Sequence, residues 1–223
     1  MSMEHAVKVT CPKCGTEGDF VIWRSLNTQL NPDMKAKVLS GEIFRFRCPK
    51  CGEESSVVYP MLYHQMEDQI MIHLVTSDED VEDAAKAFDD IANGTMMPGI
   101  DMSEADYTLR MVGTQNQLRE KIYIFDSDMD DRAVEMYKLC LKSNMLVNQP
   151  EIKVAEMFLE MNDGEPKNFA VRLEDGTWGT MPFHKEMYER IKQDMLDSSD
   201  DGKRTYFVDQ QWAIEYMDAR VPR

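Results

Sequence analysis

The sequence predicts an α+β fold with two domains, 1–147 and 148–223. Two near-identical motifs of the form Cys-Pro-Lys-Cys-Gly occur at residues 11–15 and 48–52, among short strand-like runs. Apolar residues at helical spacing begin only after residue 76. The last third of the chain mixes hairpin-like and helix-like patterns. We therefore expect a β module with a helical insert at about 7–75, a mainly helical part at 76–147 and a small α+β unit at 148–223.

The β module is expected to hold four strands and one short helix. Runs of aromatic and β-branched residues, or alternation of apolar and polar residues, predict the strands. The ends of the helix predict it: Asn31 is the expected N-cap, Pro32 stands at the first helical position, and Gly41 follows the last turn. In chain order, we expect a strand at 20–23, the helix at 32–40, and strands at 42–47, 57–60 and 70–74.

The two cysteine motifs predict one metal site. Each motif presents two thiolates, and four such soft ligands favour a closed, tetrahedral zinc site. The ligands would be Cys11, Cys14, Cys48 and Cys51. Between Cys14 and Cys48 lie 33 residues, against about 15–20 in the usual four-cysteine zinc pattern. Without the 16 residues 26–41, which hold the predicted helix, 17 remain. The module therefore matches a zinc ribbon with a helix inserted at the tip of its hairpin.

Iron is the alternative metal. A Cys-Xaa-Xaa-Cys-Gly pair at this kind of separation also resembles rubredoxin, a small one-electron carrier. Rubredoxin usually has an aromatic residue soon after its first motif, whereas Gly15 is followed here by Thr-Glu-Gly-Asp. A closed site of four thiolates has no open position at which to activate water, so its role would be to fold the module. Zinc binding of this kind contributes about 10–16 kcal/mol near neutral pH.

The mainly helical part is predicted from residue 77 onwards. Ser77 and the three acidic residues after it begin a helix whose apolar positions lie on one face, and Gly94 ends it. A further helix is expected to be capped by Asp128. In chain order, we expect the first helix at 77–93, a loop at 95–106, a strand at 107–112, and helices at 117–124 and 129–142.

The C-terminal unit is expected to contain a hairpin and two helices. Residues 174–176, Glu-Asp-Gly, have the composition of a hairpin turn. The apolar stripe of the first helix would consist of Phe183, Met187, Ile191 and Met195. The other elements are strands at 152–161, 169–173 and 177–180, a loop at 197–203, a strand at 206–208 and a short helix carrying Trp212.

Composition indicates a protein of a reducing, aqueous compartment. The chain is 43% apolar and 30% charged, and no apolar run approaches the roughly 20 residues that span a bilayer. The first residues lack the basic and apolar regions of a signal peptide. Five cysteines leave Cys140 as an odd thiol beside the two pairs, which suits a reducing compartment. We therefore predict a cytoplasmic protein with no membrane segment.

The net charge of −16 is unevenly distributed along the chain. Residues 1–75 hold 8 basic and 9 acidic side chains, whereas residues 76–223 hold 17 basic and 32 acidic ones. A nucleic-acid-binding protein concentrates positive charge to displace counterions from phosphates. The second half of this chain would instead repel a polyanion. The sequence therefore disfavours a nucleic-acid partner and predicts a solvated acidic surface.

Further short segments accompany the two cysteine motifs. They are Trp23–Asn27, Val38–Gly41, Ile43–Phe46, Val58–His64, Glu120–Ile122 and Asp130–Glu135. Together with the repeated Cys-Pro-Xaa-Cys-Gly spelling, this series resembles the CpXC-domain proteins, found mainly in bacteria and archaea, over residues 7–145. The resemblance implies a metal-binding module of uncharacterised function. It assigns the four motif cysteines to the metal and no residue to catalysis.

Two other groups of residues are candidates for a role at a site. His64 could assist a thiolate or line a ligand surface, and the simpler interpretation is a partly buried histidine that hydrogen-bonds to the backbone. Asp126, Asp128 and Asp130 echo the first ligands of a calcium loop, followed by Asp131. The later glycine and bidentate glutamate of that loop are missing. Helix capping and complementing the helix dipole explain these aspartates without a cation.

Three functions are compatible with the sequence. The preferred one is a structural zinc site that supports the binding of another protein or a small ligand, because the site is closed and no nucleophile elbow, phosphate loop or dinucleotide glycine pattern occurs. The second is an enzyme with its site between the zinc module and the acidic part, around His64 and 126–131. The third is nucleic-acid binding by the ribbon, through Arg24, Lys35, Lys37, Arg45 and Arg47.

Overall fold

The computed structural model of the chain describes residues 2–93, 107–162, 164–196 and 205–220. Its helices and sheets confirm the α+β class. The chain packs into two compact units, Met1–Arg119 and Glu120–Arg223. The predicted domains, 1–147 and 148–223, divide the chain at another place and stay a prediction. Within the described ranges, no helix combines the length and the apolar character needed to cross a membrane.

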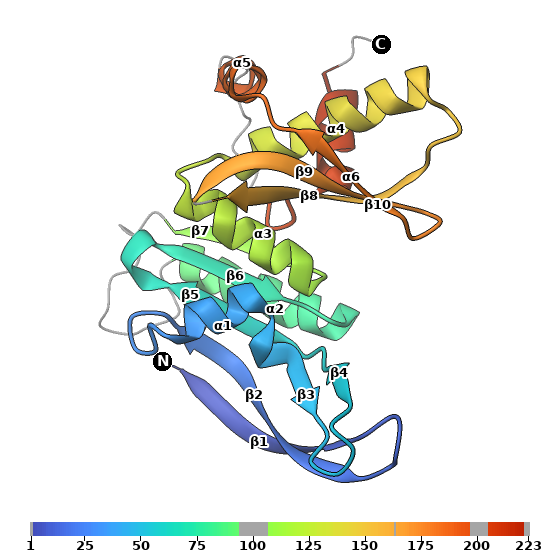
Figure 1. Ribbon diagram of the computed structural model, residues 1–223. Coiled ribbons are helices and arrows are strands. Elements are labelled where there is room, and N and C mark those ends of the chain that lie inside the picture. Colours follow the sequence, from blue (N-terminus) through green and yellow to red (C-terminus); the bar gives the residue numbers. More distant parts are fainter. Residues whose placement is uncertain (1, 94–106, 163, 197–204, 221–223) are drawn as a thin grey trace. The chain divides into compact units, whose positions relative to one another are not determined.

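A five-stranded mixed sheet forms the centre of the first unit (Figure 1). The strand order is β1-β2-β5-β6-β7; β1 with β2 and β5 with β6 are antiparallel, and β2 with β5 and β6 with β7 are parallel. The predicted strand at 70–74 is confirmed as β6, and all of its residues except the histidine are buried. The strands are β1 (Met3–Thr10), β2 (Glu17–Asn27), β5 (Met61–Gln65), β6 (Ile70–Leu74) and β7 (Thr108–Val112).

Helix α2 (Asp78–Ala92) begins as predicted and packs on this sheet. The Ser77 hydroxyl accepts a hydrogen bond from a first-turn backbone N–H at 3.2 Å, and three acidic residues occupy the first turn. Phe88 of the helix lies against His73 of β6, with the ring centroids 6.3 Å apart. The predicted end of the helix and the predicted loop, residues 94–106, lie outside the described residues.

Each cysteine motif is the turn of a β-hairpin. The first motif joins β1 to β2, and the second joins β3 (Arg45–Arg47) to β4 (Glu54–Ser56), which form a separate two-stranded sheet. Helix α1 (Met34–Ser40) lies between the two hairpins in the sequence, as expected for the helical insert. Within the described residues, however, β2 pairs with β1 and β5, and β3 pairs with β4. The strands that flank the insert therefore do not form the single hairpin that the sequence predicted.

The ends of helix α1 differ from the prediction on one side. The expected N-cap, Asn31, lies in a turn that precedes the helix, where its carbonyl accepts a hydrogen bond from the N–H of Met34 at 3.1 Å. The N-cap is Asp33, whose side chain makes no capping hydrogen bond. Gly41 follows the helix as expected, with a left-handed φ of 73°. A glycine adopts this conformation without a Cβ clash, which explains why the helix ends there.

Two predicted strands of the module differ from the structure: the strand expected at 42–47 is confirmed only over 45–47, as β3, and the strand expected at 57–60 is wrong. Residues 42–44 form the short 3-10 helix η1 (Glu42–Phe44), in which Ile43 and Phe44 are both buried. A strand would place these neighbours on opposite faces, so the apparent alternation was misleading. Residues 57–60 run without regular structure between β4 and β5. There the buried Tyr59 directs its hydroxyl to the Ile43 carbonyl at 3.1 Å and so packs this stretch against η1.

The second unit is built on a three-stranded antiparallel sheet with the order β10-β9-β8. Helices α4 and α5 pack with this sheet around one apolar core, whose buried members are Ile124, Ala133, Val134, Tyr137, Met157, Leu159, Phe169, Val171 and Tyr188. The strands are β8 (Val154–Asn162), β9 (Glu165–Leu173) and β10 (Trp178–Pro182). The helices are α4 (Asp131–Asn148), α5 (Lys185–Leu196) and α6 (Gln210–Asp218), and α3 (Gln115–Asp126) ends in this unit.

The start of α4 corrects one predicted cap. Asp130 is the N-cap, and its carboxylate accepts a hydrogen bond from the N–H of Arg132 at 2.9 Å. The predicted cap, Asp128, has a left-handed φ of 54° in the preceding turn. Aspartate tolerates this conformation better than most residues, so both acidic residues suit a turn followed by a helix start.

The last elements agree with the sequence in part. Phe183, Ile191 and Met195 pack against the core as predicted, but Met187 is 45% exposed and Tyr188 is buried in its place. The hairpin turn and the helix carrying Trp212 are confirmed. The predicted strand at 206–208 is irregular, because the carbonyls of residues 207 and 208 accept hydrogen bonds from side chains. The predicted loop at 197–203 lies outside the described residues.

Candidate metal centre

The two cysteine motifs fold into the same hydrogen-bonded turn. In each, the N–H of the first cysteine donates to the carbonyl of the residue after the glycine, at 2.9 Å in the first motif and 2.8 Å in the second. The N–H of each glycine donates back to the carbonyl of the first cysteine at 3.0 Å. Gly15 and Gly52 have φ values of 70° and 71°, a region that side chains disfavour. The identical spelling therefore produces two equivalent turns.

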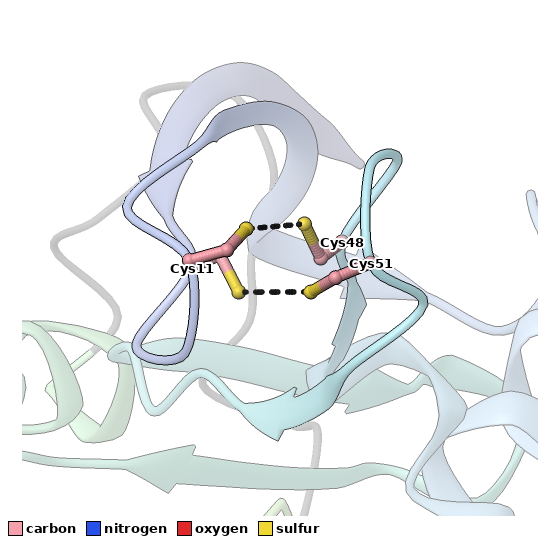
Figure 2. Close-up of side chains that lie close together, drawn as sticks. Cys11, Cys48 and Cys51 are labelled. Atoms are coloured by element: carbon pink, nitrogen blue, oxygen red, sulfur yellow. Dashed lines mark hydrogen bonds between the residues drawn. The ribbon is translucent and has the colours of Figure 1, made fainter.

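The two turns bring four thiols together (Figure 2). The sulfur atoms of Cys11, Cys14, Cys48 and Cys51 all lie within 4.8 Å of one another. Across the turns, Cys11 Sγ is 3.7 Å from Cys51 Sγ, and Cys14 Sγ is 3.6 Å from Cys48 Sγ. Four sulfurs about 2.3 Å from a tetrahedral zinc ion lie about 3.8 Å apart, whereas disulfide-bonded sulfurs lie about 2.05 Å apart. The four cysteines could therefore hold a metal ion.

Each turn contributes one buried and one exposed thiol. Cys11 and Cys48 are 2% exposed, whereas Cys14 and Cys51 are exposed. The first cysteine of each motif directly follows a strand and is buried, and the second lies farther along the turn. A bound ion would therefore be held from inside the module and lie close to its surface.

An aromatic cluster packs behind the cysteine turns. It consists of Phe20, Phe44, Phe46 and Tyr59. Phe20 from the first hairpin meets Phe46 from the second edge-on, with the ring centroids 6.3 Å apart, and Phe44 lies 5.3 Å from Tyr59. Aromatic pairs of this kind contribute beyond their buried area. The cluster thus joins the two hairpins through side chains of both.

The hairpins also meet directly beside the site. A Cβ atom on Gly18 of β2 would lie 2.8 Å from the ring of Phe46 and 2.9 Å from Pro49, the proline of the second motif. Glycine is therefore required for this close approach. On the surface, Lys13 of the first motif forms an ion pair at 2.8 Å with Glu53, next to the second motif. Exposed pairs contribute little, so the close packing at Gly18 and the aromatic cluster are the contacts that hold the two turns together.

The thiols differ in how easily they ionise. Hydrogen bonds from the hydroxyl and the N–H of Thr16 lower the pKa of Cys14 to about 6. The Cys51 backbone N–H lowers the pKa of Cys48. The pKa of Cys51 is raised to about 12, because lost hydration and the three neighbouring thiols outweigh a hydrogen bond from the Glu53 N–H. Four negative charges at this spacing repel one another, so a divalent cation is what would let all four thiols ionise together.

His64 of β5 contacts side chains rather than a thiolate. Its Nδ1 is 3.4 Å from the Asn27 side-chain nitrogen, and its Nε2 is 3.0 Å from the Tyr107 hydroxyl. An amide nitrogen can only donate, so Nδ1 accepts and Nε2–H donates to the tyrosine oxygen. Burial lowers the pKa of His64, which favours this neutral ring. The ring has a structural role, although its partners are side chains and not the backbone as predicted.

The four predicted aspartates have separate positions. Asp126 ends α3, Asp128 lies in the turn, Asp130 caps α4, and Asp131 is buried against Lys121 at 2.8 Å. Among the residues that the structure describes, the four motif cysteines are the one group of three or more potential ligands close enough to share a metal. The structure therefore favours capping and ion pairing for these aspartates over a calcium loop.

The second unit contains a buried ionic network that was not predicted from the sequence. Its members are Glu120, Lys121, Asp131, Glu135 and Lys138, each no more than 5% exposed. A signal for it was present, because positions 131, 135 and 138 lie on one face of α4, the face that also carries the apolar residue Val134 into the core. Charged residues at core spacing on a helix predict such a network when oppositely charged residues also occur on a neighbouring helix.

Most of the first unit and the start of the second match a known protein family. A family model described as CpXC protein matches residues 9–138, which is more than half of the chain and includes both cysteine motifs. No curated protein and no solved structure matches the chain. The match also covers the segments at 120–122 and 130–135, which contain most of the buried ionic network. The chain therefore belongs to the CpXC family.

Proposed function

We propose that this CpXC protein binds one zinc ion through Cys11, Cys14, Cys48 and Cys51, and that the ion ties the two hairpins of the first unit together. The observation that supports this function is the separation of the sulfur atoms, 3.6 and 3.7 Å across the turns, against about 3.8 Å in a tetrahedral zinc thiolate. Four thiolates complete the coordination sphere, so the ion would have a structural role.

Zinc is preferred to iron as the bound ion. Both metals accept four thiolates in a tetrahedral site, so the donor set alone does not separate them. The first motif lacks the aromatic residue that usually follows it in rubredoxin, since Gly15 is followed by Thr16 and Glu17. A cytoplasmic location would keep the four thiols reduced and ready for a metal.

The zinc-fixed module would bind another protein or a small ligand without chemistry of its own. A closed donor set and the use of both His64 ring nitrogens in hydrogen bonds support this role. Nucleic acid is the less favoured partner, because Lys37 lies 4.0 Å from Asp33 and Arg45 lies 3.9 Å from Glu54, so acidic groups accompany part of the basic set. The net charge of −16 also opposes a polyanion.

The metal content of the purified full chain tests the proposal. Inductively coupled plasma mass spectrometry, combined with native mass spectrometry, should find one zinc per chain in protein prepared without added metal. The variant Cys11→Ser/Cys48→Ser, which removes the buried ligand of each turn, should lose it. The control Cys140→Ser should keep it.

Three results would count against the proposal. Metal retained in the double variant would exclude this ligand set, and stoichiometric iron with visible thiolate-to-iron absorption would replace zinc by the alternative metal. Turnover of compounds from a broad substrate panel by the zinc-loaded protein, absent from a matched blank preparation, would overturn the role as a binding module.

A further inference from the structure

Strand β1 lies at one edge of the five-stranded sheet of the first unit. It ends the order β1-β2-β5-β6-β7, and among the described strands it pairs only with β2 (Figure 1). None of its eight residues is buried, whereas three of the five residues of β7, at the other edge, are buried. β1 also contains no proline or glycine to interrupt pairing. A long, exposed edge of this kind is a template on which a further strand can pair.

The backbone groups of alternate β1 residues point away from β2. Directly after the strand, the N–H of Cys11 donates across the hairpin to the Thr16 carbonyl at 2.9 Å. In an antiparallel pair, every second residue directs its N–H and C=O to the same neighbour, so residues 5, 7 and 9 also face β2. Glu4, Ala6 and Lys8 therefore direct theirs to the opposite side, which we call the outer edge of β1.

The sequence of β1 is complementary to itself when two copies run antiparallel. Glu4 and Lys8 stand at equal distances on either side of Ala6. In a pairing with a two-fold axis at Ala6, this residue faces its own copy, and each Glu4 faces the Lys8 of the other copy. Residues whose backbone groups face the outer edge then meet one another, and each such pair exchanges two hydrogen bonds. Opposite charges directly across two strands stabilise the pairing.

Other registers lose this match. Only slides by an even number of residues keep the outward-facing groups opposite one another. A slide by two residues in one direction sets Glu4 opposite Ala6, and the same slide in the other direction sets Lys8 opposite Ala6. Neither register leaves a pair of opposite charges. The charges of β1 therefore select the register centred on Ala6.

The neighbouring side chains suit the same register. Lys8 forms an ion pair at 2.6 Å with Asp19 of β2. With Glu4 of a second copy on its other side, the ammonium would lie between two carboxylates. On the other face of the strand, the side chain of Met3 is 47% exposed and would stand opposite Val9 of the second copy. The pairing would thus cover exposed apolar surface as well as join opposite charges.

We propose that two copies of this chain associate through the outer edges of their β1 strands, antiparallel and centred on Ala6, to form one continuous sheet. An edge pairing of this length buries less surface than a standard interface of about 1,600 Å², so the dimer is weak and depends on concentration. The proposal rests on the backbone of β1 and on two of its charges, and it holds whichever ion the four cysteines bind.

The alternative is that Glu4 and Lys8 protect the edge. Charged residues on an edge strand prevent pairing in many monomeric proteins. The two views differ in what they expect when one charge is reversed. If the charges only protect the edge, the chain is a monomer with or without the reversal. If they join two copies, the reversal weakens a dimer that the wild type forms.

Sedimentation velocity on the full chain, with any purification tag at the C-terminus, tests this. The wild type should pass from monomer to dimer between micromolar and near-millimolar concentration. Glu4→Lys turns both opposite pairs into like pairs and should raise the dissociation constant roughly 10- to 100-fold. Glu82→Lys, the same change at an exposed position of α2, should dimerise as the wild type does. Both variants reduce a net charge of −16, so weaker general repulsion cannot explain a loss of the dimer.

A mixture of two variants tests the register. Lys8→Glu should also weaken the dimer, because it places two carboxylates opposite each other. When it is mixed with Glu4→Lys, both cross-strand pairs join opposite charges again, so native mass spectrometry should find the heterodimer in excess of either homodimer. A wild type that stays monomeric throughout, a dimer that Glu4→Lys leaves unchanged, or a mixture without preference for the heterodimer would each overturn the proposal.

Amide exchange followed by NMR locates the contact. As the concentration rises, the N–H groups of Glu4, Ala6 and Lys8 should become protected, because they gain partners at the outer edge. The N–H groups of residues 5, 7 and 9 already face β2 and should change little. A dimer that forms without this alternating protection uses another surface, and the proposal is then wrong.

Discussion

Replacing Gly18 by alanine should weaken zinc binding without touching a ligand. The new Cβ would lie 2.8 and 2.9 Å from two atoms of the Phe46 ring and 2.9 Å from Pro49 Cδ, where ordinary contact begins at 3.4 Å. These neighbours must therefore move away by about 0.5–0.6 Å. Pro49 follows Cys48 directly, so its movement carries the second cysteine turn away from the first (Figure 2).

The size of the effect follows from this displacement. Metal–ligand distances are held to within about 0.2 Å, so a shift of half an ångström cannot be absorbed by the zinc–sulfur bonds alone. Overpacking of this kind costs about 1–3 kcal/mol. If the whole cost falls on the zinc-bound form, the dissociation constant for zinc rises roughly 5- to 150-fold. If the clash also destabilises the metal-free protein, that share of the strain energy does not change the affinity for zinc.

A competition titration with a chromophoric zinc chelator measures this change. The matched control is Gly179→Ala in β10, where a Cβ would meet no atom within 4 Å, and its zinc affinity should equal that of the wild type. The reasoning is refuted if Gly18→Ala binds zinc as tightly as the control.

The remaining predictions concern a histidine, a tyrosine and the metal. NMR titration should place the pKa of His64 below 6.5, because burial disfavours the charged ring. The stability that the neutral ring contributes is then present above about pH 6.5. It is lost as the pH falls through the lower pKa of the folded state. Asn27→Asp should raise that pKa, since a carboxylate would stabilise the imidazolium beside it, and an unchanged value would contradict the geometry. Tyr188→Phe should lower the free energy of unfolding of the second unit by about 1–3 kcal/mol, because the Asp130 N–H loses an acceptor at 2.8 Å. Chemical denaturation measures this change. A variant as stable as the wild type would show that the hydrogen bond is dispensable. Removing zinc with a chelator should speed hydrogen exchange in β3 and β4 far more than in β5 and β6, and uniform exchange would contradict a local role for the ion.

The local geometry of the metal centre could be predicted from the sequence, because it depends on residues close in the chain. The five residues of each motif form a turn whose glycine takes a left-handed conformation and whose backbone closes through hydrogen bonds at the first cysteine. The distance between the two turns could not be predicted in this way. It depends on Gly18 packing against Phe46 and Pro49, residues about 30 positions away in the sequence. No local pattern reports such a contact.

The secondary structure likewise was predicted where local sequence determines it and was not predicted where tertiary contacts do. Strand β6 and helix α2 were predicted well, since an apolar run and a serine followed by acidic residues act locally. The strand expected at 42–47 was right only from residue 45 onwards, and the strand expected at 57–60 was wrong, because Ile43, Phe44 and Tyr59 are buried by one another and by the first hairpin. Where tertiary contacts bury consecutive residues, the alternation that predicts a strand loses its meaning.

The buried charges could not be placed because sequence patterns treat charge as a sign of exposure. Lys138 and Glu120 are 18 positions apart and meet across two helices, each almost completely buried. Burial raises the pKa of Glu120, and the same low-dielectric surroundings strengthen its attraction to Lys138. Neither residue would be stable there alone, so each explains the presence of the other.

Both units thus bring together groups of like charge that need a cation, and they differ in where that cation comes from. In the second unit, three carboxylates are paired with Lys121 and Lys138, which the chain itself supplies. In the first unit, the sulfur atoms of four thiols lie within 4.8 Å of one another, and Lys13 forms its ion pair with Glu53 on the surface. The proposed zinc ion would supply the positive charge that the two lysines supply in the second unit. The first unit should therefore depend on metal supply for the packing of its hairpins, and the second should not.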